Sequence, residues 1–222
     1  MDQYTRFRLP IMVLVYVILR FFGGSFGSLV LYPVVLMVTF LHEFGHALGA
    51  LLTGGNVLEL VINADGSGYT KSQGGNAAII LMGGYLGSAI LGNILLYIGV
   101  KKRSWAQRAL IALAFMMALC SIIWFQTIQT TLILCAFSVS LFFIAYKTTF
   151  DQDVLLFLGI ATVLYIIQDF NVGPSSDLEQ YEQVVGIFNA KVWRYFWLLL
   201  VVLITLWNLR KIFGNFTTRA RA

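Results

Sequence analysis

Seven apolar segments alternate with short polar breaks along the 222-residue chain. Several of them reach the roughly 20 residues that a helix needs to cross a hydrocarbon core of about 30 Å. The predicted membrane helices cover residues 9–22, 28–52, 77–100, 107–125, 130–146, 153–168 and 192–213. The first segment is short for a full span, so we expect it to be tilted or partly re-entrant.

Residues 53–76 separate the second and third segments and have no helical pattern. Glycine pairs open and close this stretch, and Asp-Gly-Ser-Gly at 65–68 supplies a tight turn between residues 57–62 and 69–70. The pattern predicts a small β-hairpin. Because unpaired strand edges are not tolerated in lipid, the hairpin must lie at the membrane surface or pack against protein.

The composition agrees with a membrane location, because 59% of residues are hydrophobic, only 11% are charged and the mean hydropathy is +0.83. Soluble domains are about one quarter charged. We therefore predict an all-α polytopic integral membrane protein, with about six to seven transmembrane helices and a small membrane-associated hairpin. Residues 1–222 would form one domain in the cell membrane. The net charge of +5 comes mostly from loops and the C-terminal tail, which indicates contact with lipid headgroups and not with nucleic acid.

The third segment carries closely spaced small residues, namely Gly83, Gly84, Gly87, Ser88 and Gly92. Small residues three or four positions apart let two membrane helices approach closely. We expect this segment to pack tightly against its neighbours.

His42, Glu43 and His46 form a His-Glu-x-x-His motif inside the second apolar segment, and the chain has no other histidine. The two imidazoles lie one helical turn apart on the same face, so they can occupy two corners of a tetrahedral zinc site. Glu43 is placed to act as a general base toward a water molecule. Ionisable residues within a membrane span are costly, and they indicate function by default.

A hydrolytic zinc site has three protein ligands and leaves the fourth position to water, so the third ligand should be a carboxylate. Four predicted spans separate the motif from residues 169–191, and this even number returns that segment to the same side. Asp177 is favoured because it follows Pro174 at the start of a short predicted helix. A role as the N-cap alone is the competing interpretation for Asp177. Asp169 remains a possible alternative or supporting ligand.

The motif continues into a longer stretch that resembles the site-2 protease family of intramembrane zinc metalloproteases. The resemblance covers residues 35–95, through LHEFGHALGALLTGG, VINADGSGYT and MGGYLGSAILG. It implies that His42 and His46 are zinc ligands, that Glu43 is the base and that Asp177, in a Ser-Asp motif, is the third ligand. Many members have Leu-Asp-Gly where this chain has Ser-Asp-Leu. The resemblance also implies that the hairpin pairs with an extended substrate by strand addition.

The sequence therefore predicts hydrolysis of peptide bonds in membrane-embedded protein substrates, with Zn²⁺ as cofactor. A non-proteolytic zinc-binding membrane protein, such as a chaperone or adaptor, and a metal transporter are the alternatives. Glu43 weighs against the first, because zinc storage needs no base. The single compact ligand set weighs against the second. Water would enter through a polar niche formed by residues 169–177 with Asn63, Ser67, Thr70 and Asn93.

Lysine and arginine residues are distributed unevenly between the two sides of the membrane. If all seven segments span, ten of the fifteen lie on the side of Arg20 and the C-terminal tail, and five lie on the side of Asp177. The positive-inside rule assigns the richer side to the cytoplasm, which places the metal site toward the non-cytoplasmic face. The resemblance favours the opposite orientation.

Overall fold

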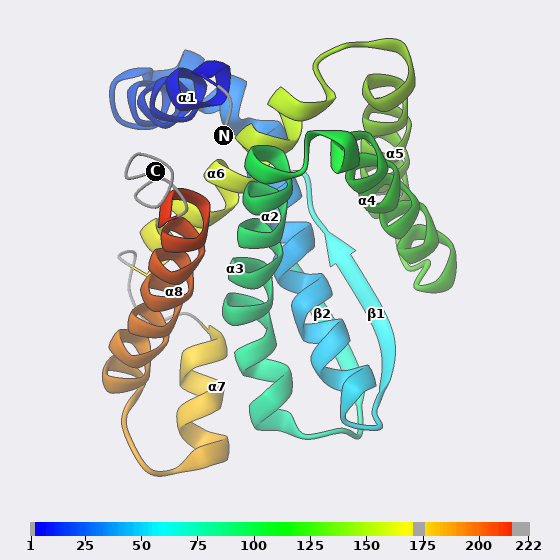
Figure 1. Ribbon diagram of the computed structural model, residues 1–222. Coiled ribbons are helices and arrows are strands. Elements are labelled where there is room, and N and C mark those ends of the chain that lie inside the picture. Colours follow the sequence, from blue (N-terminus) through cyan, green and yellow to red (C-terminus); the bar gives the residue numbers. More distant parts are fainter. Residues whose placement is uncertain (1–2, 171–175, 215–222) are drawn as a thin grey trace.

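The computed structural model describes residues 3–170 and 176–214, which form eight helices and one antiparallel hairpin (Figure 1). In chain order these are α1 (Gln3–Phe22), α2 (Gly24–Leu52), β1 (Asn56–Ile62), β2 (Gly68–Gln73), α3 (Ala77–Lys101), α4 (Arg103–Ile123), α5 (Ile128–Lys147), α6 (Asp151–Asp169), α7 (Ser176–Val185) and α8 (Ala190–Phe213). Within the described ranges, six helices are long and apolar enough to cross a membrane: α2, α3, α4, α5, α6 and α8. The predicted all-α polytopic fold with a small hairpin is thus confirmed.

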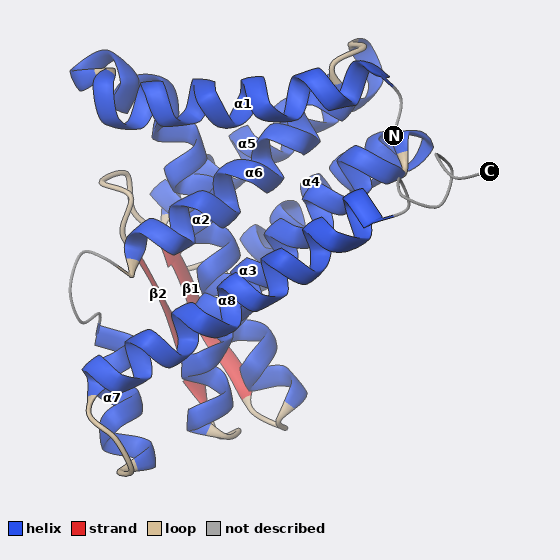
Figure 2. Ribbon diagram, turned by 60° about the vertical axis from the view of Figure 1, so that its left-hand side comes forward, coloured by secondary structure: helices blue, strands red, loops and turns tan. Residues whose placement is uncertain are grey.

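Helix α1 is the one predicted span that is not among these six candidates. Its apolar run lies between Arg8 and Arg20, which leaves too few apolar residues for a full crossing. Arg8 forms an ion pair with Asp153 in the first turn of α6, and Arg20 Nε donates a hydrogen bond to Gln168 Oε1 at 3.1 Å. Helix α1 therefore packs alongside α6, at the end of the molecule away from α7 (Figures 1 and 2).

The hairpin lies along α2 and is held there by hydrogen bonds at its turn. Thr39 Oγ1 of α2 donates to the Gly66 carbonyl at 2.7 Å, and the Tyr32 hydroxyl donates to the Ala64 carbonyl. Gly66 has φ of +90°, a left-handed conformation that the turn requires and that glycine adopts without strain. The predicted turn and both predicted strands are thus present.

The two strands of the hairpin differ in how they are covered. Strand β1 lies against α5, where Thr130 Oγ1 donates to the Ile62 carbonyl and accepts from the Ile62 amide, both at 3.1 Å. Strand β2 pairs with β1 on one side only, because the sheet has two strands. The hairpin thus packs against protein as expected, and the outer edge of β2 has no strand beside it.

Glycines bring α2 and α3 into backbone contact. A β-carbon on Gly45 would lie 2.2 Å from the Gly83 carbonyl oxygen, and one on Gly83 would lie 2.5 Å from the Gly45 oxygen. Further along α3, a β-carbon on Gly92 would lie 2.7 Å from Thr162 of α6. The predicted close packing of the third segment is therefore confirmed, and it places the histidine-bearing part of α2 directly against α3.

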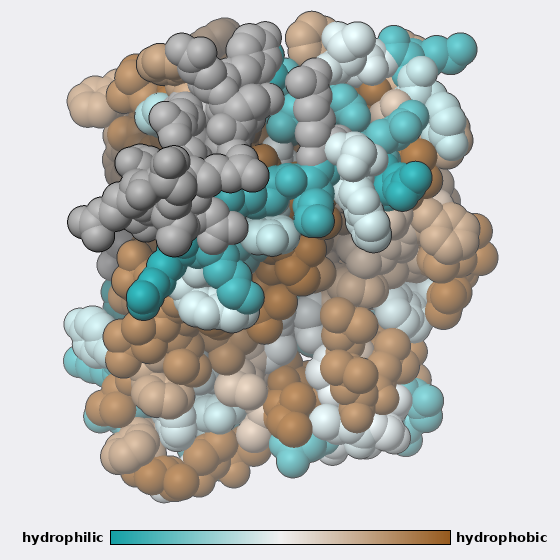
Figure 3. Space-filling view, in the orientation of Figure 1, coloured by the Kyte–Doolittle hydropathy of each residue, from teal (hydrophilic) through white to brown (hydrophobic). Residues whose placement is uncertain are grey.

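The outer surface of the helices is strongly apolar. On the face drawn in Figure 3, apolar side chains cover much of the surface, and hydrophilic ones gather mainly toward its upper end. Large side chains that are more than half exposed occur on several of the spanning helices, for example Phe115, Ile122, Leu132, Val139 and Phe143. Apolar area on this scale belongs in contact with lipid.

With six spans, the charge asymmetry across the membrane increases. Helix α1 and the end of α8 then fall on one side, so Arg6 and Arg8 join Arg20. Of the thirteen cations in residues 3–170 and 176–214, this basic side holds ten rather than eight. By the positive-inside rule, we expect this side to be cytoplasmic and α7 to lie near the opposite face.

Cysteine labelling in intact cells tests this orientation. In a background with Cys120 and Cys135 replaced, an impermeant maleimide should label Glu179→Cys from outside, because Glu179 is exposed on α7. Ser104→Cys, exposed at the start of α4, should react only after permeabilisation. External labelling of Ser104→Cys, with Glu179→Cys protected, would reverse the orientation.

Candidate metal centre

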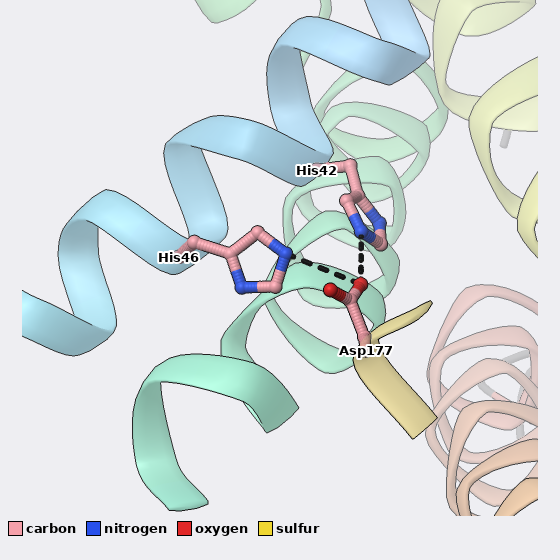
Figure 4. A group of neighbouring side chains, drawn as sticks. All are labelled: His42, His46 and Asp177. Carbon is pink, nitrogen blue, oxygen red and sulfur yellow. Dashed lines mark hydrogen bonds and ion pairs between the residues drawn. The ribbon is translucent and has the colours of Figure 1, made fainter. Parts of the chain in front are cut away.

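Three side chains from two helices converge on one point. His42 and His46 project from α2, and Asp177 projects toward them from the first turn of α7 (Figure 4). Asp177 Oδ2 lies 2.9 Å from His42 Nε2 and 3.3 Å from His46 Nε2. Across the described part of the chain, these form the one group of three His, Cys, Asp or Glu residues close enough to hold a metal ion. We refer to His42, His46 and Asp177 as the metal-binding group.

The position of Asp177 depends on how α7 is anchored. Leu178 and Tyr181 are buried, and the Tyr181 ring packs edge-on against Trp197 of α8 with ring centroids 4.7 Å apart. Glu182 Oε2 accepts a hydrogen bond at 2.7 Å from the Ala190 amide, which ties α7 to the start of α8. The predicted short helix that presents Asp177 is thus present, whereas Pro174, predicted to set the preceding turn, lies outside the described residues.

Each histidine ring is oriented by a different neighbour. His46 Nδ1 donates to the Ile80 carbonyl at 2.7 Å, which turns Nε2 toward the site. The His42 ring packs edge-on against the Tyr85 ring with centroids 4.7 Å apart. Both orienting groups belong to α3, so the close contact between α2 and α3 also sets the direction of the two imidazoles.

Asp169 is not a member of the metal-binding group. Its Oδ2 accepts a hydrogen bond from the Tyr85 hydroxyl at 2.9 Å, and the Tyr85 ring in turn packs edge-on against the His42 ring. This geometry favours Asp177 over Asp169 as the third ligand, and the assignment itself stays a prediction. The sequence pattern gave no sign of Tyr85, because a tyrosine between glycines in an apolar helix looks like ordinary packing.

The environment of Asp177 keeps its carboxyl group ionised. Burial opposes ionisation, but hydrogen bonds to His42 and His46 outweigh it and lower the pKa of Asp177 below its usual range. An ionised carboxylate is the form that binds a metal. Asp177 can therefore supply the carboxylate in a set of two imidazoles and one carboxylate, which is a donor set that zinc accepts.

The space among these residues also suits a metal ion. Tetrahedral zinc with bonds of about 2.0–2.2 Å separates its ligand atoms by about 3.3 Å, close to the distances from Asp177 to the two histidines. A β-carbon on Gly84 would lie 2.5 Å from His46 Nε2 and 2.6 Å from His42 Nε2. Glycine at position 84 thus leaves room at the two nitrogen atoms that would bind the ion.

Glu43 lies between the histidines in sequence and faces the same cavity as they do. Its side chain is 5% exposed, and its Oε2 lies 2.9 Å from Thr70 Oγ1 of β2, which donates to it. The cavity has a volume of about 600 Å³ and is lined by the metal-binding group together with β2, the first half of α3 and α7. A buried carboxylate thus faces a space large enough for water and a peptide.

The predicted polar niche is present only in part. Thr70 contacts Glu43 and lines the cavity, whereas Asn63 and Ser67 bond to each other in the hairpin turn. Asn93 lies elsewhere, where its side chain bonds to Thr205 and Asn208 of α8. The sequence could not show which of these polar residues line the cavity, because a polar residue that joins two helices or closes a turn looks the same in the sequence as one that faces a cavity.

Metal analysis of single variants tests the ligand set. The wild-type protein should hold about one zinc ion per chain, and His42→Ala, His46→Ala or Asp177→Ala should lose it. Asp169→Asn is the matched control, because it removes a carboxylate that contacts Tyr85 and not the histidines. Loss of zinc in Asp169→Asn with full retention in Asp177→Ala would exchange the roles of the two aspartates.

Comparison with known proteins identifies the family of this chain. The family model described as Peptidase M50B-like matches residues 10–208, which is most of the chain and includes all three members of the metal-binding group. Neither the curated proteins nor the solved structures contain a match. Because the family model covers far more than half of the sequence, the chain belongs to the Peptidase M50B-like family.

Proposed function

We propose that this protein is an intramembrane zinc metalloprotease that hydrolyses peptide bonds of membrane-embedded protein substrates. The observation that carries the proposal is the convergence of Asp177 on His42 and His46, with Glu43 facing the same cavity. Membership of a peptidase family and six membrane-spanning helices support it.

His42, His46 and Asp177 would hold the zinc ion through two nitrogen atoms and one carboxylate oxygen. When bound there, zinc supplies Lewis acidity, polarising a carbonyl and lowering the pKa of water from 15.7 to about 7. A hydrolytic zinc site takes three protein ligands and keeps one position for water, and His42, His46 and Asp177 would supply those three ligands at the edge of the cavity.

Glu43 would carry the proton transfers. Its carboxylate takes a proton from the attacking water and later delivers that proton to the departing amine. Thr70 donates to Glu43 Oε2 and so fixes the direction of the carboxylate before the reaction. Gly68 of β2 lies against Glu43, where a β-carbon would lie 3.0 Å from Cγ, so the strand and the base pack closely.

The outer edge of β2 would bind the substrate backbone. This edge has no strand beside it, and β2 lines the cavity that contains Glu43 and the histidines. An extended peptide that adds to this edge would place a carbonyl beside Glu43, since Thr70 of the same strand bonds to that residue. A substrate helix must unwind locally before it can pair in this way.

The alternative functions account for fewer of these features. A zinc-binding chaperone or adaptor has no need for a carboxylate fixed by Thr70 toward the cavity. A metal transporter would need further ligands along a path, and the described residues hold one metal-binding group. The family match is also to a peptidase.

Replacement of the base provides the direct test of catalysis. Glu43→Gln should retain zinc and fold but lose cleavage of a membrane-embedded reporter helix in liposomes by a factor of about 10²–10⁴, because an amide cannot accept the proton. Glu59→Gln is the matched control, since Glu59 bonds to Tyr69 and Lys71 on the hairpin and does not line the cavity. Wild-type cleavage rates in Glu43→Gln would disprove the mechanism.

Strand addition predicts how the substrate backbone affects cleavage. A reporter helix with a Gly-Gly pair at the cleavage site should be cut faster than one with Ala-Ala there, because glycine lowers the cost of unwinding a helix by about 1 kcal/mol per residue. The ratio of initial rates at equal reporter density in liposomes measures this effect. Equal rates for the two reporters would argue against binding of an extended backbone.

A further inference from the structure

A second cavity, apart from the metal centre, lies between α1, α2 and α6. Its volume is about 140 Å³. Because a molecule of liquid water occupies about 30 Å³, this volume has room for about four waters or one phosphate group. Its polar lining consists of Tyr16, Arg20, Ser28 and Tyr165, and the rest is aliphatic.

Tyr16 is the most buried part of this lining. The residue is 1% exposed, and its hydroxyl has no hydrogen-bond partner within the described structure. Burial raises the pKa of Tyr16 to about 12, against a smaller lowering by the Arg20 guanidinium, so the hydroxyl stays protonated and can donate. Buried hydroxyls nearly always have a partner, and a bound acceptor in the cavity would supply one.

Arg20 brings a positive charge to the same cavity. Its Nε donates to Gln168, a neutral group, and Arg20 forms no ion pair with any carboxylate of residues 3–170 or 176–214. A guanidinium has five N–H donors, so most of them remain for a ligand. Its planar geometry matches the oxygen atoms of a phosphate.

The surface around this corner is apolar. The end of α1 and the start of α2 carry four large side chains that are 63–81% exposed: Phe21, Phe22, Phe26 and Leu29. A ligand that suits both features has an anionic head and hydrocarbon chains. Arg20 also lies on the side of the membrane that holds most of the cations, where anionic lipids gather if that side is cytoplasmic.

We propose that this cavity binds the phosphate group of an anionic phospholipid. The Arg20 guanidinium pairs with the phosphate, Tyr16 donates a hydrogen bond to it, and the acyl chains lie along the exposed phenylalanines of the α1–α2 corner. The site is independent of the proteolytic function, because it uses none of the residues assigned to zinc or to proton transfer.

Native mass spectrometry of the full-length protein tests this proposal. Phosphatidylglycerol has a net negative charge, whereas the choline cation of phosphatidylcholine neutralises its phosphate and is repelled by Arg20. With the same acyl chains, phosphatidylglycerol should therefore bind about tenfold or more tightly, and Arg20→Gln should abolish that preference. Tyr16→Phe, which keeps the ring and so the packing, should weaken phosphatidylglycerol binding, and Arg20→Lys should retain part of it. Arg210→Gln is the matched control, since Arg210 is an exposed cation in the last turn of α8, away from the cavity.

Three results would overturn the proposal. The first is equal binding of the two lipids by the wild type. The second is the same lipid preference in Arg20→Gln as in Arg210→Gln. The third is displacement of phosphatidylglycerol by millimolar inorganic phosphate, which would show that the site takes free phosphate and not a lipid. A melting temperature for each variant identifies any that fail to fold.

Discussion

Burial of Glu43 and His46, and partial burial of His42, within one membrane-spanning helix is the constraint on which this structure depends. An unpaired polar group costs about 2–7 kcal/mol in an apolar environment, so each of the three must have a partner. The partners come from three other elements: α3 orients both imidazoles, β2 donates to Glu43, and α7 presents Asp177. Loss of any one of these partner groups would leave a polar side chain of α2 without one of its contacts.

Backbone contact between α2 and α3 makes this arrangement possible. At Gly45 and Gly83 the helices approach too closely for a side chain, and Gly84 leaves space beside both Nε2 atoms. The same contact brings the Ile80 carbonyl and the Tyr85 ring to the histidines. Helix packing and the positions of the two histidines therefore both depend on a few closely spaced glycines, so a substitution chosen to loosen the helices would also displace His42 and His46.

Much of this was predictable from the sequence, because the strongest signals are local. The His-Glu-x-x-His spacing, the glycine-bounded hairpin and the long apolar runs each specify their structure within a few turns. Asp177 needed a topological argument, and the count of spans placed it on the correct side without distinguishing it from Asp169. Only the fold shows that Asp169 bonds to Tyr85 and lies outside the group formed by His42, His46 and Asp177. The apolar run of α1 was misleading for a physical reason, since Arg8 and Arg20 bond to α6 and leave no full span between them.

The central claim is that zinc is held by two histidines of α2 and by Asp177, beside a base that is not itself a ligand. Anomalous diffraction above the zinc edge, from crystals of the Glu43→Gln protein, tests it most directly. We expect one peak about 2.0–2.2 Å from His42 Nε2, His46 Nε2 and an Asp177 carboxylate oxygen, with position 43 outside bonding distance. A peak bound by Asp169 in place of Asp177, or no peak between the two histidines, would contradict it.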